Sequence, residues 1–260
     1  MTQTRLFRER SGDPEGPRVL WLHGALVSSW MWTPQLEALP WYDSLVIDLP
    51  GHGHNHEVEW VSFEHTADLL LATLDEEGFE APVNLVGMSL GAVVALHLLA
   101  RDPARFRRAA LTGAAAKPLS RVMTWANLAV GALTQVPGAE GLVGRALQLP
   151  PEAREGFSEG GLALDRRSFF RINDQLLDDF LPGTLAEVAQ PTLLLVGEEE
   201  QAITFESQRI LRAALAHSQA RVAPSCHHAW SGENPELFSA TVDAWIKNIA
   251  LPTALLPLPD

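Results

Sequence analysis

The stretch VNLVGMSLGAVVALHLL, residues 83–99, joins two kinds of local structure through a single serine. Its first four residues, Val83–Val86, are typical of a buried strand, and the run Leu90–Arg101 predicts a helix. Between them Ser89 must turn the chain sharply, and the glycines two positions before and after it leave room for that turn. The stretch therefore predicts a strand–turn–helix unit that exposes the Ser89 hydroxyl.

The same alternation of strand and helix recurs along the chain. Most of the strand-like runs are apolar at every position, and few alternate between apolar and polar residues. This is expected for parallel strands whose two faces are both covered by helices. The sequence therefore predicts an α/β fold with a doubly wound, mostly parallel sheet. The other predicted strands are Val19–Leu22, Ser44–Ile47, Ala109–Thr112, Thr192–Val196 and Ala220–Ala223, and the other predicted helices are Phe63–Glu77, Glu206–Leu215 and Pro235–Ile249.

Residues 115–186 interrupt this alternation. No strand-like run occurs there, apolar residues recur at helical spacing, and Gly and Pro pairs divide the stretch into short helices. We therefore expect a helical cap over residues 115–186, inserted into an α/β core of residues 1–114 and 187–260. We also expect an apolar substrate pocket lined by Leu26, Met88, Trp125 and Leu128.

Length and composition narrow the classes of function. The 260 residues are enough for one well-buried core, and 47% hydrophobic with 20% charged residues is typical of a globular protein. The net charge of −13 makes nucleic acid and membrane surfaces poor partners. The charged N-terminus and the lack of a long apolar run predict a cytoplasmic protein.

The sequence gives no indication of a metal or cofactor. Cys226 is the single cysteine, which excludes an intramolecular disulfide and a multi-cysteine zinc site. His52, His54 and His56 alternate, but no carboxylate–histidine spacing of a known metal site surrounds them. We therefore expect neither a metal nor a cofactor.

Residues Gly87–Gly91 match G-x-S-x-G, a weak pattern alone but a specific one between a strand and a helix. In that setting the first amides of the helix stabilise negative charge next to the serine hydroxyl. Three further motifs accompany it in order: His23-Gly24, Asp48–Gly53 and His228–Trp230. With these four motifs, the chain resembles the α/β-hydrolase superfamily over nearly its whole length.

The resemblance implies a role for each motif. Ser89 corresponds to the nucleophile. The amides of Leu90 and Ala25 correspond to the oxyanion hole, with Leu26 as the second choice after Ala25. His228 is the expected base, rather than the adjacent His227, which stands where the family usually has a small residue. The acid is expected after the strand Thr192–Val196, at Glu200, with Glu199, Glu198 or a residue elsewhere as alternatives.

These roles imply a serine hydrolase that cleaves carboxylic esters of small-to-medium apolar substrates through an acyl-enzyme. The expected partner is a small ester-like molecule. The same fold and triad also serve C–C bond hydrolysis, thioester hydrolysis and acyl transfer. A further alternative is a ligand sensor or signalling protein that keeps the fold and loses most of the catalysis.

Overall fold

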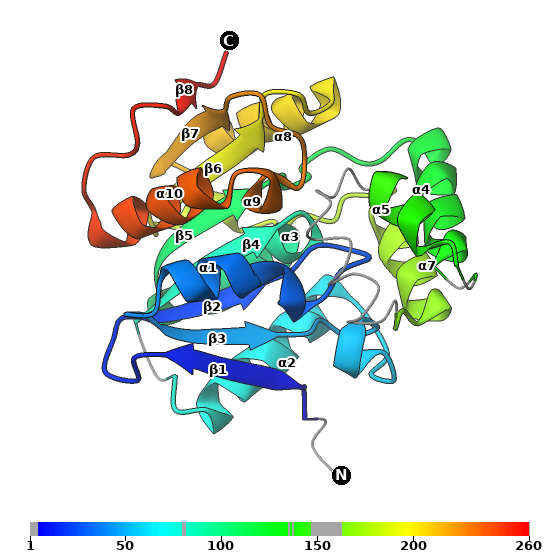
Figure 1. The fold of residues 1–260 in the computed structure, drawn as a ribbon, viewed down its shortest axis with the longest axis horizontal. Coiled ribbons are helices and arrows are strands. Elements are labelled where there is room, and N and C mark those ends of the chain that lie inside the picture. The colour runs from blue at the N-terminus through cyan, green and yellow to red at the C-terminus, as the bar shows by residue number, and fades with distance from the viewer. Residues whose placement is uncertain (1–4, 80–81, 135, 137, 147–162, 260) are drawn as a thin grey trace.

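The computed structural model describes residues 5–79, 82–134, 136, 138–146 and 163–259. Their strands form one eight-stranded sheet in the order β1-β3-β2-β4-β5-β6-β7-β8 (Figure 1). The two edge strands run antiparallel to their neighbours, and all other neighbouring strands are parallel. The predicted mostly parallel sheet is confirmed. The strands are β1 (Arg8–Gly12), β2 (Arg18–Leu22), β3 (Asp43–Ile47), β4 (Val83–Met88), β5 (Phe106–Thr112), β6 (Thr192–Gly197), β7 (Ser218–Ala223) and β8 (Leu256–Pro257).

Helices cover both faces of the sheet, so the central strands are buried on both sides. On β2, Leu20 and Leu22 belong to one apolar core, and Val19 and Trp21 belong to the other. This explains why the strand is apolar at every position rather than at alternate ones. The first core packs under α2 (Phe63–Glu76), α3 (Leu90–Arg101) and α8 (Ala202–Ala214), and the second under α1 (Thr33–Ala38), α9 (Trp230–Glu233) and α10 (Pro235–Lys247).

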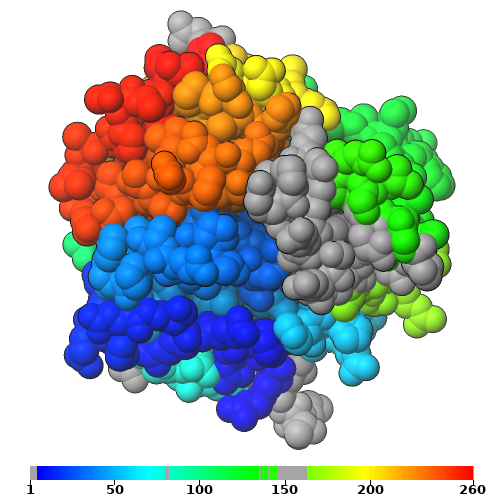
Figure 2. Space-filling view, in the orientation of Figure 1, coloured from blue at the N-terminus to red at the C-terminus, as the bar shows by residue number. Residues whose placement is uncertain are grey.

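The second core brings the two ends of the sequence together. Gln35 of α1 donates a hydrogen bond of 2.8 Å from Nε2 to the carbonyl oxygen of Ser231 in α9. Figure 2 shows the blue N-terminal segments packed directly against the orange C-terminal ones. The loop before α9, which carries His227 and His228, is therefore fixed against the first third of the chain.

The strand order reverses between β2 and β4, which is where open α/β sheets bind their ligands. The Ala25 loop follows β2, and Ser89 follows β4. The N-terminus of α3 lies very close to the end of β2, since a Cβ at Gly91 would lie 2.3 Å from the carbonyl oxygen of Leu22. Only a glycine fits at position 91.

The closeness of α3 and β2 gives a stability prediction. Gly91→Ala is expected to lower the free energy of unfolding by about 3 kcal/mol, because the new methyl group meets backbone atoms that cannot rotate away. Gly141→Ala is the matched control, since a Cβ at that helical glycine meets open space. That control should change stability by less than about 1 kcal/mol. Urea unfolding measures both changes, and equal values would contradict the packing described here.

Three α-helices occupy the described residues between β5 and β6: α4 (Arg121–Leu133), α5 (Glu140–Ala146) and α7 (Arg166–Gln175). They lie together at one end of the sheet (Figure 1). These helices agree with the helical structure that the sequence predicts for this region. Residues 147–162 of the predicted cap lie outside the described residues. The division into core and cap stays a prediction. Every helix in the described ranges is too short or too polar to span a membrane.

Candidate active site

Ser89 lies in a strained turn between β4 and α3. Its backbone has φ +52° and ψ −112°, a conformation that non-glycine residues rarely adopt. The amide of Ser89 donates to Thr112 O at 2.8 Å, which ties the turn to the end of β5. A Cβ at Gly87 would lie 2.7 Å from Gly91 O, so the turn needs its flanking glycines. The strand–turn–helix unit predicted from residues 83–99 is confirmed.

Two backbone segments meet beside Ser89. Helix α3 begins at Leu90, and its first amides have no carbonyl partner within the helix. The loop after β2 brings Ala25 to the same cavity. Leu26 follows with φ +64°, so this loop is strained as well.

His23 fixes the conformation of that loop. Its Nδ1–H donates to Gly24 O at 2.7 Å, and its Nε2 accepts from the amide of Leu49 at 2.8 Å. Burial lowers the pKa of His23, which keeps the ring neutral. The hydrogen bonds of the ring therefore hold this loop in place.

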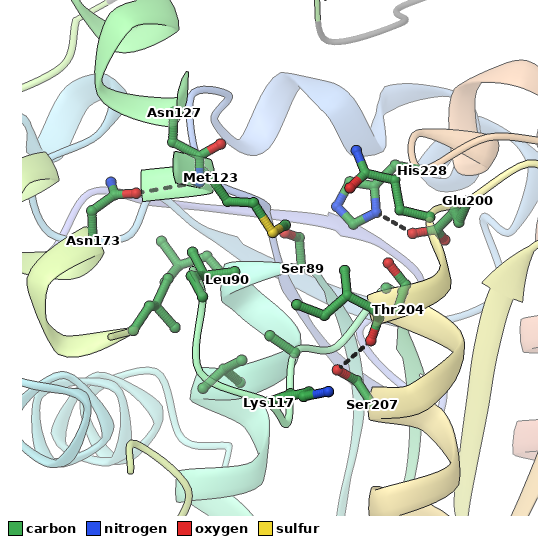
Figure 3. Close-up of a pocket in the computed structure, with 18 of the residues that line it drawn as sticks. Ser89, Leu90, Lys117, Met123, Asn127, Asn173, Glu200, Thr204, Ser207 and His228 are labelled. Carbon is green, nitrogen blue, oxygen red and sulfur yellow. Dashed lines mark hydrogen bonds and ion pairs between the residues drawn. The ribbon is translucent and has the colours of Figure 1, made fainter. Parts of the chain in front are cut away.

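His228 and Glu200 form a close pair. Nδ1 of His228 donates to Oε2 of Glu200 at 2.6 Å (Figure 3). The other carboxylate oxygen accepts from the amide of Gly197 at 3.0 Å. The Glu200 side chain is 2% exposed, whereas that of His228 is 40% exposed. The imidazole lies over Gly113, where a Cβ would be 2.5 Å from Cε1 of His228. Because Glu200 takes Nδ1–H, Nε2 is left as the proton acceptor of the ring.

The pKa values of the pair shift as an ion pair requires. Burial lowers the pKa of His228, but the charge of Glu200, the hydrogen bond to it and the charge of Glu233 together outweigh burial, so the pKa is raised. Burial raises the pKa of Glu200, but His228 and the other hydrogen bonds outweigh it, so that pKa is lowered. Each partner therefore stabilises the charged form of the other.

His227 faces a different carboxylate. Its amide donates to Oε2 of Glu233 at 3.0 Å, and its Nδ1 lies 3.1 Å from the same oxygen. His227 is not among the residues that line the cavity beside Ser89, whereas His228 is. The two adjacent histidines are thus held apart by two separate glutamates.

Glu198 and Glu199, the other two candidates for the acid, lie at the surface and form hydrogen bonds with the backbone. Glu198 accepts from the amide of Ser225 at 2.8 Å, and the amide of Glu199 donates to Cys226 O at 2.8 Å. Both residues are exposed, and Glu199 lines the rim of the cavity. Among the three glutamates, the structure pairs only Glu200 with an imidazole.

A cavity of about 380 Å³ lies over Ser89. It lies between α3, α8 and the helices α4 and α7, with Ser89 at its centre (Figure 3). Its lining includes Ala25, Leu26, Ser89, Leu90, Val93, Lys117, Met123, Asn127, Phe169, Ile172, Asn173, Leu176, Glu199, Glu200, Gln201, Ile203, Thr204, Ser207 and His228. The volume suits a small ligand rather than a polymer chain.

Of the four predicted pocket residues, only Leu26 lines this cavity. Trp125 is 72% exposed, because α4 turns Met123 and Asn127, four positions apart, toward the cavity and Trp125 away from it. Leu128 packs against the small apolar cluster of Leu26 and Phe169. Met88 is buried in the core beneath Gly24.

Several polar lining residues belong to no motif and were not predicted: Lys117, Asn127, Asn173, Gln201, Thr204 and Ser207. For the two asparagines the sequence did hold an indication. Asn127 lies four positions after Met123, and Asn173 lies four positions after Phe169, so each asparagine shares a helical face with an apolar residue of the cavity.

The alternating histidines form no metal site. Among the described residues, no group of three His, Cys, Asp or Glu side chains is placed to hold a metal. Burial lowers the pKa of His52 to about 3. Nδ1 of His54 lies 3.0 Å from Oδ2 of Asp48. The structure therefore gives these residues packing and loop-bracing contacts.

The chain is similar in sequence and in fold to known proteins. The chain is 27% identical over 246 residues to carboxylesterase YbfK of Bacillus subtilis, a match that covers 89% of this chain and 81% of the relative. It is 36% identical over 97 residues to 2-succinyl-6-hydroxy-2,4-cyclohexadiene-1-carboxylate synthase of Serratia proteamaculans. The chain covers only 30–37% of the length of that synthase and of its counterparts in Yersinia enterocolitica and Photorhabdus laumondii.

Solved structures share the fold. An enol-lactonase from Burkholderia xenovorans superposes with a TM-score of 0.80 at 20% identity, covering 93% of this chain and 96% of that one. A thermophilic esterase from Thermogutta terrifontis gives a TM-score of 0.77 at 24% identity, with 94% and 93% covered. The model of the alpha/beta hydrolase family matches residues 19–241. The chain therefore belongs to the alpha/beta hydrolase family.

Proposed function

We propose that this protein is a serine hydrolase that cleaves carboxylic esters through an acyl-enzyme. The observation that carries the proposal is the cavity lined at once by Ser89 and by His228, whose imidazole is bonded to the buried Glu200. The relative that matches most of this chain, YbfK, is named a carboxylesterase, which supports ester cleavage.

In the proposed mechanism, Nε2 of His228 takes the proton of Ser89 as the hydroxyl oxygen attacks the ester carbonyl. Glu200 holds the imidazole in the tautomer with Nδ1–H and stabilises the imidazolium that forms. The amides of Ala25 and Leu90 donate to the oxyanion, and each such donor is worth about 3 kcal/mol in related chemistry. His228 then protonates the departing alkoxide, and water activated by the same ring releases the acid.

The apolar part of the cavity fits the acyl group. Met123, Phe169 and Ile172 come from the helices between β5 and β6 and face the space above Ser89. The cavity volume of about 380 Å³ matches a small-to-medium acyl chain. We therefore expect short and medium esters to react faster than long ones.

Labelling with a fluorophosphonate probe tests the proposal. Wild-type protein should be modified at Ser89, as identified by peptide mapping, because only an activated serine hydroxyl attacks such a probe quickly. The protein should also hydrolyse p-nitrophenyl butyrate. If Ser89→Ala and the wild type showed the same ester turnover, the ligand-sensor alternative would replace the proposed function.

A further inference from the structure

The two sides of the cavity differ in chemistry. The side formed by α4 and α7 is mostly apolar, with Met123, Phe169, Ile172 and Leu176. Its two asparagines are bonded to protein groups. Nδ2 of Asn127 donates to Oδ1 of Asn173 at 3.3 Å, and Nδ2 of Asn173 donates to Phe169 O at 2.9 Å.

The side formed by α8 and the loops beside it is mostly polar. Gln201, Thr204 and Ser207 line it, with Ile203 as the apolar exception. The hydroxyl of Ser207 donates to Ile203 O at 2.9 Å and that of Thr204 to Glu200, so each hydroxyl oxygen remains an acceptor. Lys117 lies next to them, and its ammonium is paired with the carboxylate of Glu206 on α8. Figure 3 shows Thr204, Ser207 and Lys117 on the opposite side of the cavity from Asn127 and Asn173.

The geometry of acyl transfer decides which side receives the alcohol. The departing oxygen must lie within hydrogen-bond reach of His228, because that ring returns the proton. His228 and Glu200 lie on the α8 side of Ser89, and Leu90 lies on the side of Asn173 (Figure 3). The alcohol portion therefore extends along the polar side, and the acyl portion takes the apolar one.

The charges on the polar side favour a neutral alcohol over an anionic one. The charge of Lys117 is offset by Glu206. Glu200 is bonded to His228, which is neutral when it acts as the base, so the carboxylates of Glu199 and Glu200 give this side of the cavity a negative balance. A carboxylate or phosphate in the alcohol would meet that negative charge. Hydroxyl groups, by contrast, can donate to the hydroxyl oxygen of Thr204, whose own proton is taken by Glu200, and can both donate to and accept from the amide of Gln201.

We propose that the substrate is an ester of an apolar acyl group with a neutral, hydroxyl-bearing alcohol, and that the polar side of the cavity binds that alcohol. This inference rests on the proposed ester hydrolysis and adds the identity of the leaving group. Lys117 is the specificity-determining residue at its outer end, where its ammonium exchanges between Glu206 and a substrate hydroxyl.

Two butyrate esters with alcohols of equal size test the inference: glycerol 1-butyrate and n-pentyl butyrate. Each kcat/KM is divided by the rate constant for alkaline hydrolysis of the same ester, which removes the difference in intrinsic reactivity. The glycerol ester should then be preferred about 10-fold, since a site built for hydrogen bonds penalises an alcohol that leaves them unmade.

Lys117→Met and Glu206→Gln separate a direct role of the ammonium from a structural one. Lys117→Met should reduce the glycerol preference about 5-fold, whereas Glu206→Gln, which frees the ammonium, should keep or increase it. If both variants lowered the preference equally, Lys117 would only hold α8 in place. Equal or reversed use of the two esters by the wild type would overturn the inference and leave ester hydrolysis standing, while hydrolysis of neither would overturn the proposed function.

Discussion

His228→Ala is expected to lower kcat for p-nitrophenyl butyrate by about ten-thousand-fold or more, whereas His227→Ala should stay within about 10-fold of the wild type. The reason is the pairing of each ring. His228 is bonded to the buried Glu200 and lines the cavity with Ser89, whereas His227 is bonded to Glu233 outside it. Removing His228 takes away the proton acceptor, and removing His227 takes away only a contact that steadies the loop.

Steady-state kinetics with matched circular dichroism spectra measure both variants. The adjacent alanine substitutions change the same loop, so a general loosening of the loop would affect them similarly. A large loss in His227→Ala with near-normal activity in His228→Ala would reverse the assignment of the base. Equal large losses in well-folded variants would show that neither ring acts alone.

Glu200→Gln is expected to lower kcat by about a thousand-fold. An amide in this position keeps the shape but loses the negative charge that stabilises the imidazolium, and its NH2 group can orient the ring with the wrong nitrogen protonated. A thousand-fold loss corresponds to about 4 kcal/mol of transition-state stabilisation. The surface residues Glu198 and Glu199 provide controls, and their Gln variants should remain within about 3-fold of the wild type.

The pH profile distinguishes this role from simple support of the loop. Catalysis needs a neutral His228, so kcat/KM falls as pH drops through the pKa of the ring. Glu200 raises that pKa, and Glu233 adds to the effect. In Glu200→Gln the acidic limb of the residual activity should therefore move to lower pH. An unmoved limb, or an activity loss in Glu199→Gln of the same size, would assign the acid elsewhere.

The central strands and the turn at Ser89 were predictable because their physical causes are local. Both faces of β2 and β4 are covered, which requires apolar residues at nearly every position. The turn needs glycines at fixed offsets from Ser89, and those glycines are visible in the sequence. The strand β1 was not predicted, because its residues are mostly exposed and carry no apolar pattern.

The cavity lining was harder to predict, because it depends on how helices from different parts of the chain are rotated. The amphipathic pattern of α4 does not say which apolar side chain faces the cavity, and the structure exposes Trp125 while it directs Met123 inward. The pairing of His227 with Glu233 is likewise a contact between a loop and a short helix that no family motif describes. Tertiary packing determines these side-chain orientations and contacts.

Glu200 and His228 follow β6 and β7, two strands that are direct neighbours in the sheet. The backbone joins their two loops as well, since a Cβ at Gly197 would lie 2.4 Å from the carbonyl oxygens of Cys226 and His227. Glu200 and His228 are thus paired by the backbone of these two loops, without any contribution from the side chain at position 89. A Ser89→Ala protein should accordingly retain its full binding apparatus and capture an intact ester for crystallography.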